Sequence, residues 1–241
     1  KQEVEHLRAL EVDAGMELRL FPYSMVTVSI FDDYTRTVPE WTGINVNRNT
    51  NRGGLKLRVK PGGGRLEFNL AYTFSFDLID ESDMFAFTNK IGHEIRLNAK
   101  WRLLPKTAVF LEAIQQINGY LDPTGGTEAI KDLKTSSLIP NSDSTPLRLY
   151  LGFSGLITPR FSVMLKVGYG NAFYDDNDSY NMIVGQGEFT FFISPLAKIK
   201  GGFEHSFSDS FLSNYFVDER AYLGYDHFII NRILLHLAGE Y

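Results

Sequence analysis

A single long stretch of strict alternation, Arg65–Leu78, constrains the fold of this chain more than any other feature. Every second residue from Leu66 to Leu78 is apolar, and the residues between them are polar or small. Side chains alternate between the two faces of a β-strand, so this stretch predicts a strand with one apolar and one polar face. Strands of soluble proteins usually run about 5–6 residues, whereas a tilted strand that spans a membrane needs about 9–11. The stretch is therefore long enough to cross a bilayer.

The same pattern recurs along the whole chain and predicts about twelve strands. Some segments alternate as strictly as the first, and others, such as Thr107–Asn118, are less tidy. An even strand number of about twelve is typical of bacterial single-chain barrels. The predicted strands are Leu10–Leu20, Met25–Asp33, Gly54–Lys60, Arg65–Leu78, Ile91–Leu103, Thr107–Asn118, Leu147–Ile157, Phe161–Phe173, Ile183–Ile193, Ala197–Phe207, Arg220–His227 and Ile233–Tyr241.

Short turns and long polar loops alternate between these strands. The short turns contain Pro22, Pro105, Pro159, Pro195 or the glycine-rich run Pro61–Gly64, and proline presets a turn dihedral and cannot donate to a ladder. The long loops lie at about 34–52, 79–90, 119–146, 174–181 and 208–217. Short turns on one rim and long loops on the other are typical of outer-membrane barrels. We therefore predict an all-β fold, a transmembrane antiparallel up-and-down β-barrel, with residues 1–241 as one domain.

The composition excludes several other classes of protein. The hydrophobic fraction is 44%, and no apolar run approaches the roughly 18 residues of a membrane-spanning helix. A barrel is compatible with this composition because apolar and polar residues alternate along each of its strands, so its apolar face forms no continuous apolar run in the sequence. The net charge of −5 argues against a nucleic-acid partner. The absence of cysteine excludes disulfides and thiolate metal sites, and no cofactor is indicated.

The first and last predicted strands raise a problem of orientation. If the short turns are periplasmic, Leu10–Leu20 runs towards the periplasm and Ile233–Tyr241 runs away from it. Both ends would then lie on the outer face, whereas such barrels normally keep both termini in the periplasm. Either the chain is part of a larger, even-stranded barrel of at least about fourteen strands, or its orientation is unusual. The repeated turn chemistry favours the first explanation.

The polar faces of the predicted strands carry the charged residues that would line a barrel lumen. Basic residues gather near the short-turn ends, and acidic residues gather towards the long loops. One interpretation is a cationic inner mouth that favours anionic solutes or saccharides, because rings of charge set selectivity. The other is that opposite charges pair across strands in a wet lumen. The lumen-lining candidates are Arg58, Glu67, Glu94, Arg96, Lys100, Arg148, Lys166, Glu188, Lys200 and Arg220.

The histidines offer little for catalysis. None forms a zinc-type pair at helical spacing, and His93 and His205 fall on the predicted lipid-facing register. Membrane hydrolases need a carboxylate–histidine or serine–histidine set held at one rim. His236 near Glu240 supplies half of such a set at most, and the sequence places no nucleophile beside it. We therefore do not expect an enzyme.

A short acidic run in the predicted loop 174–181 is a weak candidate for metal binding. It consists of Asp175, Asp176 and Asp178, and clustered carboxylates are ligands that Ca²⁺ prefers. The run lacks the spacing and the distal glutamate of an EF-hand. A solvated loop is therefore the favoured interpretation, and no metal site is predicted elsewhere.

Several strand-and-turn segments carry a family resemblance. They are Leu103–Phe110, Gly155–Arg160, Lys166–Gly170, Phe192–Pro195 and Tyr222–Tyr225. Together they resemble the β-barrel porin families of Gram-negative bacteria, which include barrels associated with polysaccharide secretion. The resemblance implies an integral outer-membrane protein surrounded by lipid and lipopolysaccharide, with periplasmic or envelope proteins as further partners. It suggests a porin-like channel or a polysaccharide or solute export pore. The alternative is a structural barrel that anchors a partner complex through its loops or turns.

Overall fold

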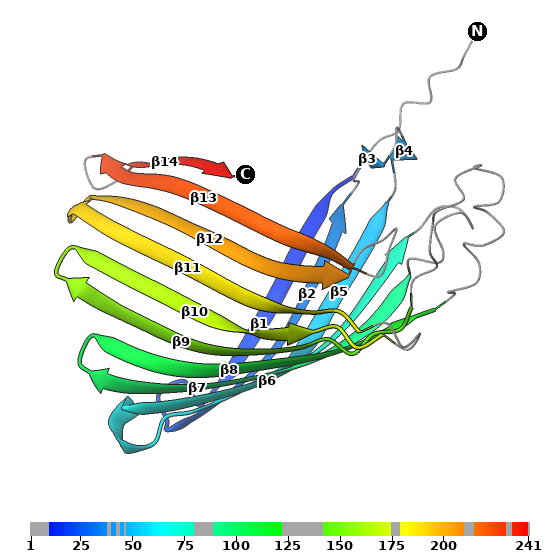
Figure 1. Ribbon diagram of the computed structural model, residues 1–241, viewed down its shortest axis with the longest axis horizontal. Coiled ribbons are helices and arrows are strands. Elements are labelled where there is room, and N and C mark those ends of the chain that lie inside the picture. The colour runs from blue at the N-terminus through cyan, green and yellow to red at the C-terminus, as the bar shows by residue number, and fades with distance from the viewer. Residues whose placement is uncertain are drawn as a thin grey trace, which may run out of the picture.

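Almost all of the described chain is antiparallel β-structure (Figure 1). The computed structural model describes residues 10–37, 40–41, 44–45, 47–79, 89–121, 142–174, 179–209, 215–229 and 233–240. One sheet holds twelve strands in chain order, each antiparallel to the next, so the predicted up-and-down architecture is confirmed. No helix in the described part of the chain is long and apolar enough to cross a membrane.

Each of the twelve predicted segments corresponds to one strand of this sheet. Many strands are long, and β6 and β7 contain 14 and 15 residues. The strands are β1 (Val12–Leu20), β2 (Val26–Thr37), β5 (Arg48–Val59), β6 (Leu66–Ile79), β7 (Lys90–Leu104), β8 (Thr107–Tyr120), β9 (Leu147–Thr158), β10 (Phe161–Asn171), β11 (Asn181–Ser194), β12 (Ala197–Asp209), β13 (Tyr215–Ile229) and β14 (Ile233–Glu240).

The loop predicted at about 34–52 is wrong in part, because strand structure continues into it. β2 and β5 remain paired up to Thr37 and Arg48, and a small separate hairpin, β3 (Glu40–Trp41) and β4 (Ile44–Asn45), lies between them. The extension of the two long strands is polar, so hydrophobic alternation does not mark it. Backbone pairing and polar contacts, such as the 2.7 Å hydrogen bond from Tyr34 to Asn49, support it instead.

The sheet curves into a trough (Figure 1), and contacts between polar side chains identify its concave face as the polar one. Lys166 on β10 reaches Glu112 on β8, with 3.4 Å between Nζ and Oε2, across the intervening strand β9. Likewise, Tyr222 on β13 donates a hydrogen bond to Glu188 on β11. Side chains of strands that are two apart meet where a sheet bends towards them, so this face is concave. The opposite face carries the alternating apolar side chains, many of them exposed, including Phe68.

The two edges of the sheet are β1 and β14. Pairing runs in a linear order from one to the other, and no ladder joins β1 to β14 among the described residues. β1 is exposed along nearly its whole length. The described strands therefore form an open sheet rather than a closed cylinder.

The short turns lie at one end of the sheet and are tightly built. At Pro61–Gly64 the three glycines have φ values of 62°, 74° and 86°, a region that residues with a Cβ rarely enter. Further backbone hydrogen bonds tie turn residues to the next hairpin. The amide of Leu156 donates to the carbonyl of Lys106 at 3.0 Å, and that of Phe192 donates to Arg160 at 2.8 Å. These bonds fix the turn rim as a continuous edge.

The close pairing of β9 and β10 gives a test of this sheet. A Cβ on Gly168 would overlap the carbonyl oxygen of Leu149, whereas a Cβ on Gly119 would meet no atom within 4 Å. We expect Gly168→Ala to lower the free energy of unfolding by about 1–3 kcal/mol, the usual range for overpacking. Gly119→Ala should change it by about 0.5 kcal/mol or less. Urea unfolding followed by circular dichroism measures both, and equal effects would contradict the β9–β10 register.

Candidate functional site

A first group of charged side chains lies across β7, β8 and β10 on the concave face. Arg96 lies 3.0 Å from Glu94 and 3.7 Å from Glu112, and Lys166 lies 3.4 Å from Glu112. The alternation of these strands directs all four side chains to the same face. Glu112 is buried, so its two cationic partners offset the unfavourable loss of water around its carboxylate. The group is nearly balanced in charge.

A second group lies across β11, β12 and β13. Lys200 lies 3.0 Å from Glu188, and Arg220 lies 2.8 Å from Glu204. Tyr222 donates a hydrogen bond to Glu188. The ammonium of Lys200 lies over the Tyr222 ring, with Nζ 5.9 Å from the ring centroid. Here too each cation has a carboxylate partner, so the middle of the concave face carries paired charges.

The balance changes at the turn rim, where several cations share one carboxylate. Glu67 lies 3.6 Å from Arg58 and 3.7 Å from both Lys60 and Arg102. Lys100 is the residue directly opposite Glu67 in the β6–β7 register. One carboxylate cannot neutralise this many cations, so the local potential is positive. We call Arg58, Lys60, Lys100 and Arg102 the rim cations.

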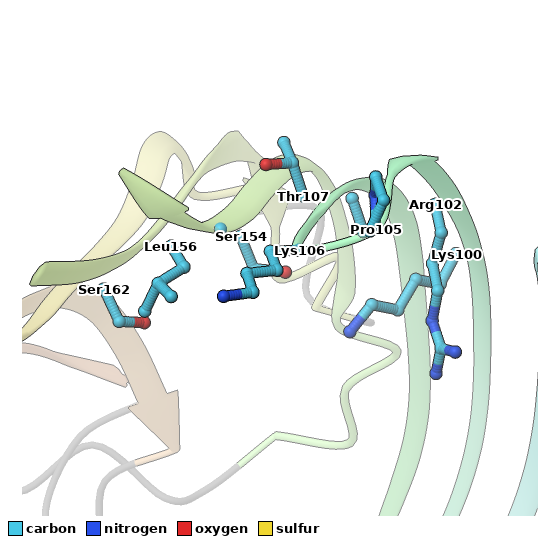
Figure 2. Close-up of a pocket in the computed structure, with 10 residues that line it drawn as sticks. Lys100, Arg102, Pro105, Lys106, Thr107, Ser154, Leu156 and Ser162 are labelled. Atoms are coloured by element: carbon cyan, nitrogen blue, oxygen red, sulfur yellow. The ribbon is translucent and has the colours of Figure 1, made fainter. Parts of the chain in front are cut away.

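Two of the rim cations also line a pocket of about 270 Å³ beside the turns that join β7 to β8 and β9 to β10 (Figure 2). Lys100, Arg102 and Lys106 extend to the same side of the sheet there, and the hydroxyls of Ser154 and Ser162 lie on that side as well. Neither Lys100 nor Lys106 has an ion pair or side-chain hydrogen bond within the part of the chain that the structure describes. The pocket therefore holds cationic groups that are not neutralised.

At the opposite, loop end, the concave face carries an apolar cluster. Alternation along β12 would place Phe207 on the outward face with Phe203, which is half exposed. Instead Phe207 is fully buried, because the pairing of β11 with β12 ends at Gly185 and His205 and the end of β12 turns inward. The loop-side cluster consists of Ile114, Tyr150, Ala172, Tyr174, Val184 and Phe207.

Arg148 holds the inward-turned end of β12 in place. Its guanidinium donates one hydrogen bond to the carbonyl oxygen of Phe207 at 2.6 Å and another to the Gln116 side chain at 2.9 Å. It also lies 4.4 Å from the centroid of the Phe207 ring. A Cβ on Gly170 would overlap that ring, so only glycine leaves room for it. The loop side of the concave face is thus filled where the turn side is open and charged.

The structure distributes the ten predicted lumen-lining residues over these regions, and all ten share the polar face. The first group contains Glu94, Arg96 and Lys166, and the second group contains Glu188, Lys200 and Arg220. The turn rim contains Arg58, Glu67 and Lys100, and the loop side contains Arg148. That they line a lumen stays a prediction.

Sequence reasoning missed several residues of the candidate site. Glu112 and Glu204 stand at inward positions of predicted strands, so consistent alternation would have found both. Lys106 lies in a turn, where alternation gives no direction. No sequence pattern indicated the burial of Phe207, because it depends on the residue at which the pairing of β12 with β11 ends.

The two histidines that the sequence assigns to the apolar face lie there, apart from the charged groups of the concave face. His93 lies opposite Phe74 on the apolar face, with its Nδ1 2.8 Å from the Tyr72 hydroxyl, and His205 lies 3.1 Å from Glu219. The carboxylates of the predicted calcium candidate, at positions 175, 176 and 178, lie outside the described residues, as does the side chain of His236. Among the described residues, no group of three or more potential ligands could hold a metal ion.

Comparison with known proteins gives similar folds but no family. No protein-family model and no curated protein matches the chain. Solved structures that resemble it include the FrpB iron transporter of Neisseria meningitidis (F3-3 variant), with 11% identity, a TM-score of 0.48, and 85% of this chain and 41% of that chain covered. The alcaligin outer-membrane receptor FauA of Bordetella pertussis has 10% identity, a TM-score of 0.49 and coverage of 94% and 42%. The outer-membrane channel DcaP of Acinetobacter baumannii has 15% identity, a TM-score of 0.47 and coverage of 97% and 63%.

This chain therefore spans about two fifths to three fifths of the length of these proteins. At such identities and TM-scores the similarity assigns neither an activity nor a substrate. The predicted membership of a β-barrel porin family is not confirmed, since no family model matches.

The anchoring of β12 by Arg148 can be tested directly. Arg148→Ala removes both hydrogen bonds of the guanidinium, and bonds to charged groups contribute roughly 1.5–3 kcal/mol each. We expect amide hydrogen exchange at residues 206–208 to rise by about tenfold. Arg96→Ala, which removes an arginine of the first charged group, should leave exchange there unchanged. Unchanged exchange in the Arg148 variant would show that β12 holds its position without it.

Proposed function

We propose that this chain forms the wall of a water-filled channel for hydrophilic solutes in a bacterial outer membrane. The observation that carries the proposal is the contrast between the two faces of one sheet. The concave face holds paired charges that link strands two apart, such as Lys166 and Glu112, and the convex face is apolar. Membrane barrels have a polar interior and an apolar outer band of this kind.

The convex face has the chemistry of a lipid-facing surface. Its apolar side chains are exposed over many strands, an arrangement that in water would be a large apolar patch. Exposed aromatic rings lie near both ends of the strands, with Trp101, Phe189 and Phe191 towards the turn rim and Tyr169 and Phe173 towards the loops. Aromatic rings prefer the two membrane–water interfaces. A bilayer would therefore cover the band between them.

A membrane location also requires that the two open edges be paired. Unpaired backbone groups of a sheet edge do not face the hydrocarbon of a bilayer, because each would lose its hydrogen bonds to water. β1 runs towards the turn rim and β14 runs away from it, so the two could pair in antiparallel fashion. Pairing with further strands would meet the same requirement. In either arrangement the polar concave face becomes the interior.

An interior of this width favours a channel over a filled barrel. Side chains fill a barrel of about eight strands, and larger barrels leave space. The loop-side cluster with Phe207 narrows that space without spanning the charged regions below it. The alternative, a structural barrel that anchors a partner, would be favoured if the cluster closed the lumen completely.

Single-channel recording in planar bilayers tests the proposal. We expect the reconstituted protein to show stable open steps, and we expect Phe207→Ala to raise their conductance by removing a ring from the interior. Phe203→Ala is the matched control, because it removes the same ring from the convex face of the same strand. It should leave the conductance unchanged. If neither the native protein nor the Phe207 variant conducts, the structural alternative is correct.

A further inference from the structure

We infer that the pocket beside the β7–β8 turn is a binding site for a small phosphate-bearing solute. Lys100, Arg102 and Lys106 line it together with the hydroxyls of Ser154 and Ser162 (Figure 2). The inference rests on the proposed channel, since it names the class of solute that the turn-side mouth would select. The site itself can be tested without any flow of ions.

The cations of the pocket are positioned by two features of the fold, a strand and the turn that follows it. Lys100 and Arg102 stand two residues apart on β7 and so share the concave face. Lys106 lies in the tight turn that follows, and its backbone carbonyl is held by the amide of Leu156 at 3.0 Å. Because strand and turn backbones are both fixed by hydrogen bonds, the positions of these three residues around the pocket are set before any ligand arrives.

The positive charge of this space is not cancelled by nearby carboxylates. Arg102 lies 3.7 Å from Glu67, but that carboxylate is already shared with Arg58 and Lys60. The cations of the two charged groups have close partners instead, as Lys200 has Glu188 at 3.0 Å. Lys100 and Lys106 lack such partners among the described residues. An anion that enters the pocket would therefore meet charges that no carboxylate of the described chain neutralises.

The mixture of donors fits a phosphate group better than a single carboxylate. A phosphate monoester carries close to two negative charges and three strong acceptor oxygens at neutral pH. Arginine can bind two of its oxygens in parallel, and lysines act as point charges. Ser154 and Ser162 offer hydroxyls to the remaining oxygens or to a sugar attached to the phosphate. The volume of about 270 Å³ suits a solute of this size.

The position of the pocket explains what such a site would do. It lies at the turn rim, below the paired charges of the first group, so it would concentrate the anion at one mouth of the channel. Clefts lined with one sign of charge raise the local concentration of oppositely charged solutes. The paired charges further along the concave face would then bind the anion less tightly and permit its release.

The decisive experiment measures binding to the folded, detergent-solubilised protein by equilibrium dialysis. The probes are inorganic phosphate and glucose 6-phosphate, with glucose and acetate as competitors. We expect both phosphates to bind, and we expect the double variant K100Q/K106Q to raise their Kd about tenfold or more. Lys90→Gln is the matched control, because it removes the same charge from the loop end of the same strand. It should leave the Kd unchanged.

The results distinguish a failure of the phosphate-binding site from a failure of the proposed channel. Binding that is lost in K100Q/K106Q but kept in K90Q supports the pocket, whether or not the protein conducts ions. Absence of phosphate binding in a protein that conducts overturns the pocket and leaves the channel standing. Equal loss of binding in K90Q would show attraction by net charge alone. Competition by acetate as strong as that by phosphate would overturn the assignment to phosphate.

Discussion

The strict alternation of side chains along hydrogen-bonded strands is the constraint on which the rest of this structure depends. Because each strand has a period of two, the register of one ladder decides which residues face the polar side. Between β6 and β7 the register sets Leu70 opposite Leu97 and Asn69 opposite Asn98. A slip by one residue would exchange the two faces of a strand, moving charges onto the apolar side. Long ladders and tight turns together prevent such a slip.

The concave face is graded along the strands rather than uniformly polar. Cations in excess lie at the turn rim, charges in close pairs lie in the middle, and an apolar cluster occupies the loop side of β8 to β12. The paired region stabilises buried carboxylates such as Glu112, because the loss of one partner would leave a charge without compensation. The turn end carries an excess of positive charge, whereas the loop end carries an apolar cluster in place of paired charges. In the proposed channel, the turn end would attract anions and the loop end would restrict the space through which they pass.

The sequence predicted the number, type and order of the strands well, because alternation is a local signal that each strand carries for itself. Arg65–Leu78 and Thr107–Asn118 were each found within a residue or two of β6 and β8. Strand ends in polar segments were missed, as at Arg48, since polar residues on both faces leave no pattern.

The candidate site was predictable only where it follows from alternation. The polar face of Arg96, Lys100 and Lys166 could be assigned from their strands, but their partners depend on which strands curve towards each other. The burial of Phe207 does not follow from the alternation of its own strand, which continues without a bulge to Asp209. It arises from the point at which β12 separates from β11 and from the anchor at Arg148, and neither is a local property of the sequence.

A cysteine scan of β6 tests the central claim, that one face of this sheet contacts water and the other contacts lipid. The chain has no native cysteine, so each introduced thiol is the only one present. In liposomes, a water-soluble maleimide should label cysteines at Asn69, Ala71 and Thr73 quickly and cysteines at Phe68, Leu70 and Tyr72 slowly. Rapid labelling at all six positions would show that both faces contact water and would contradict the account.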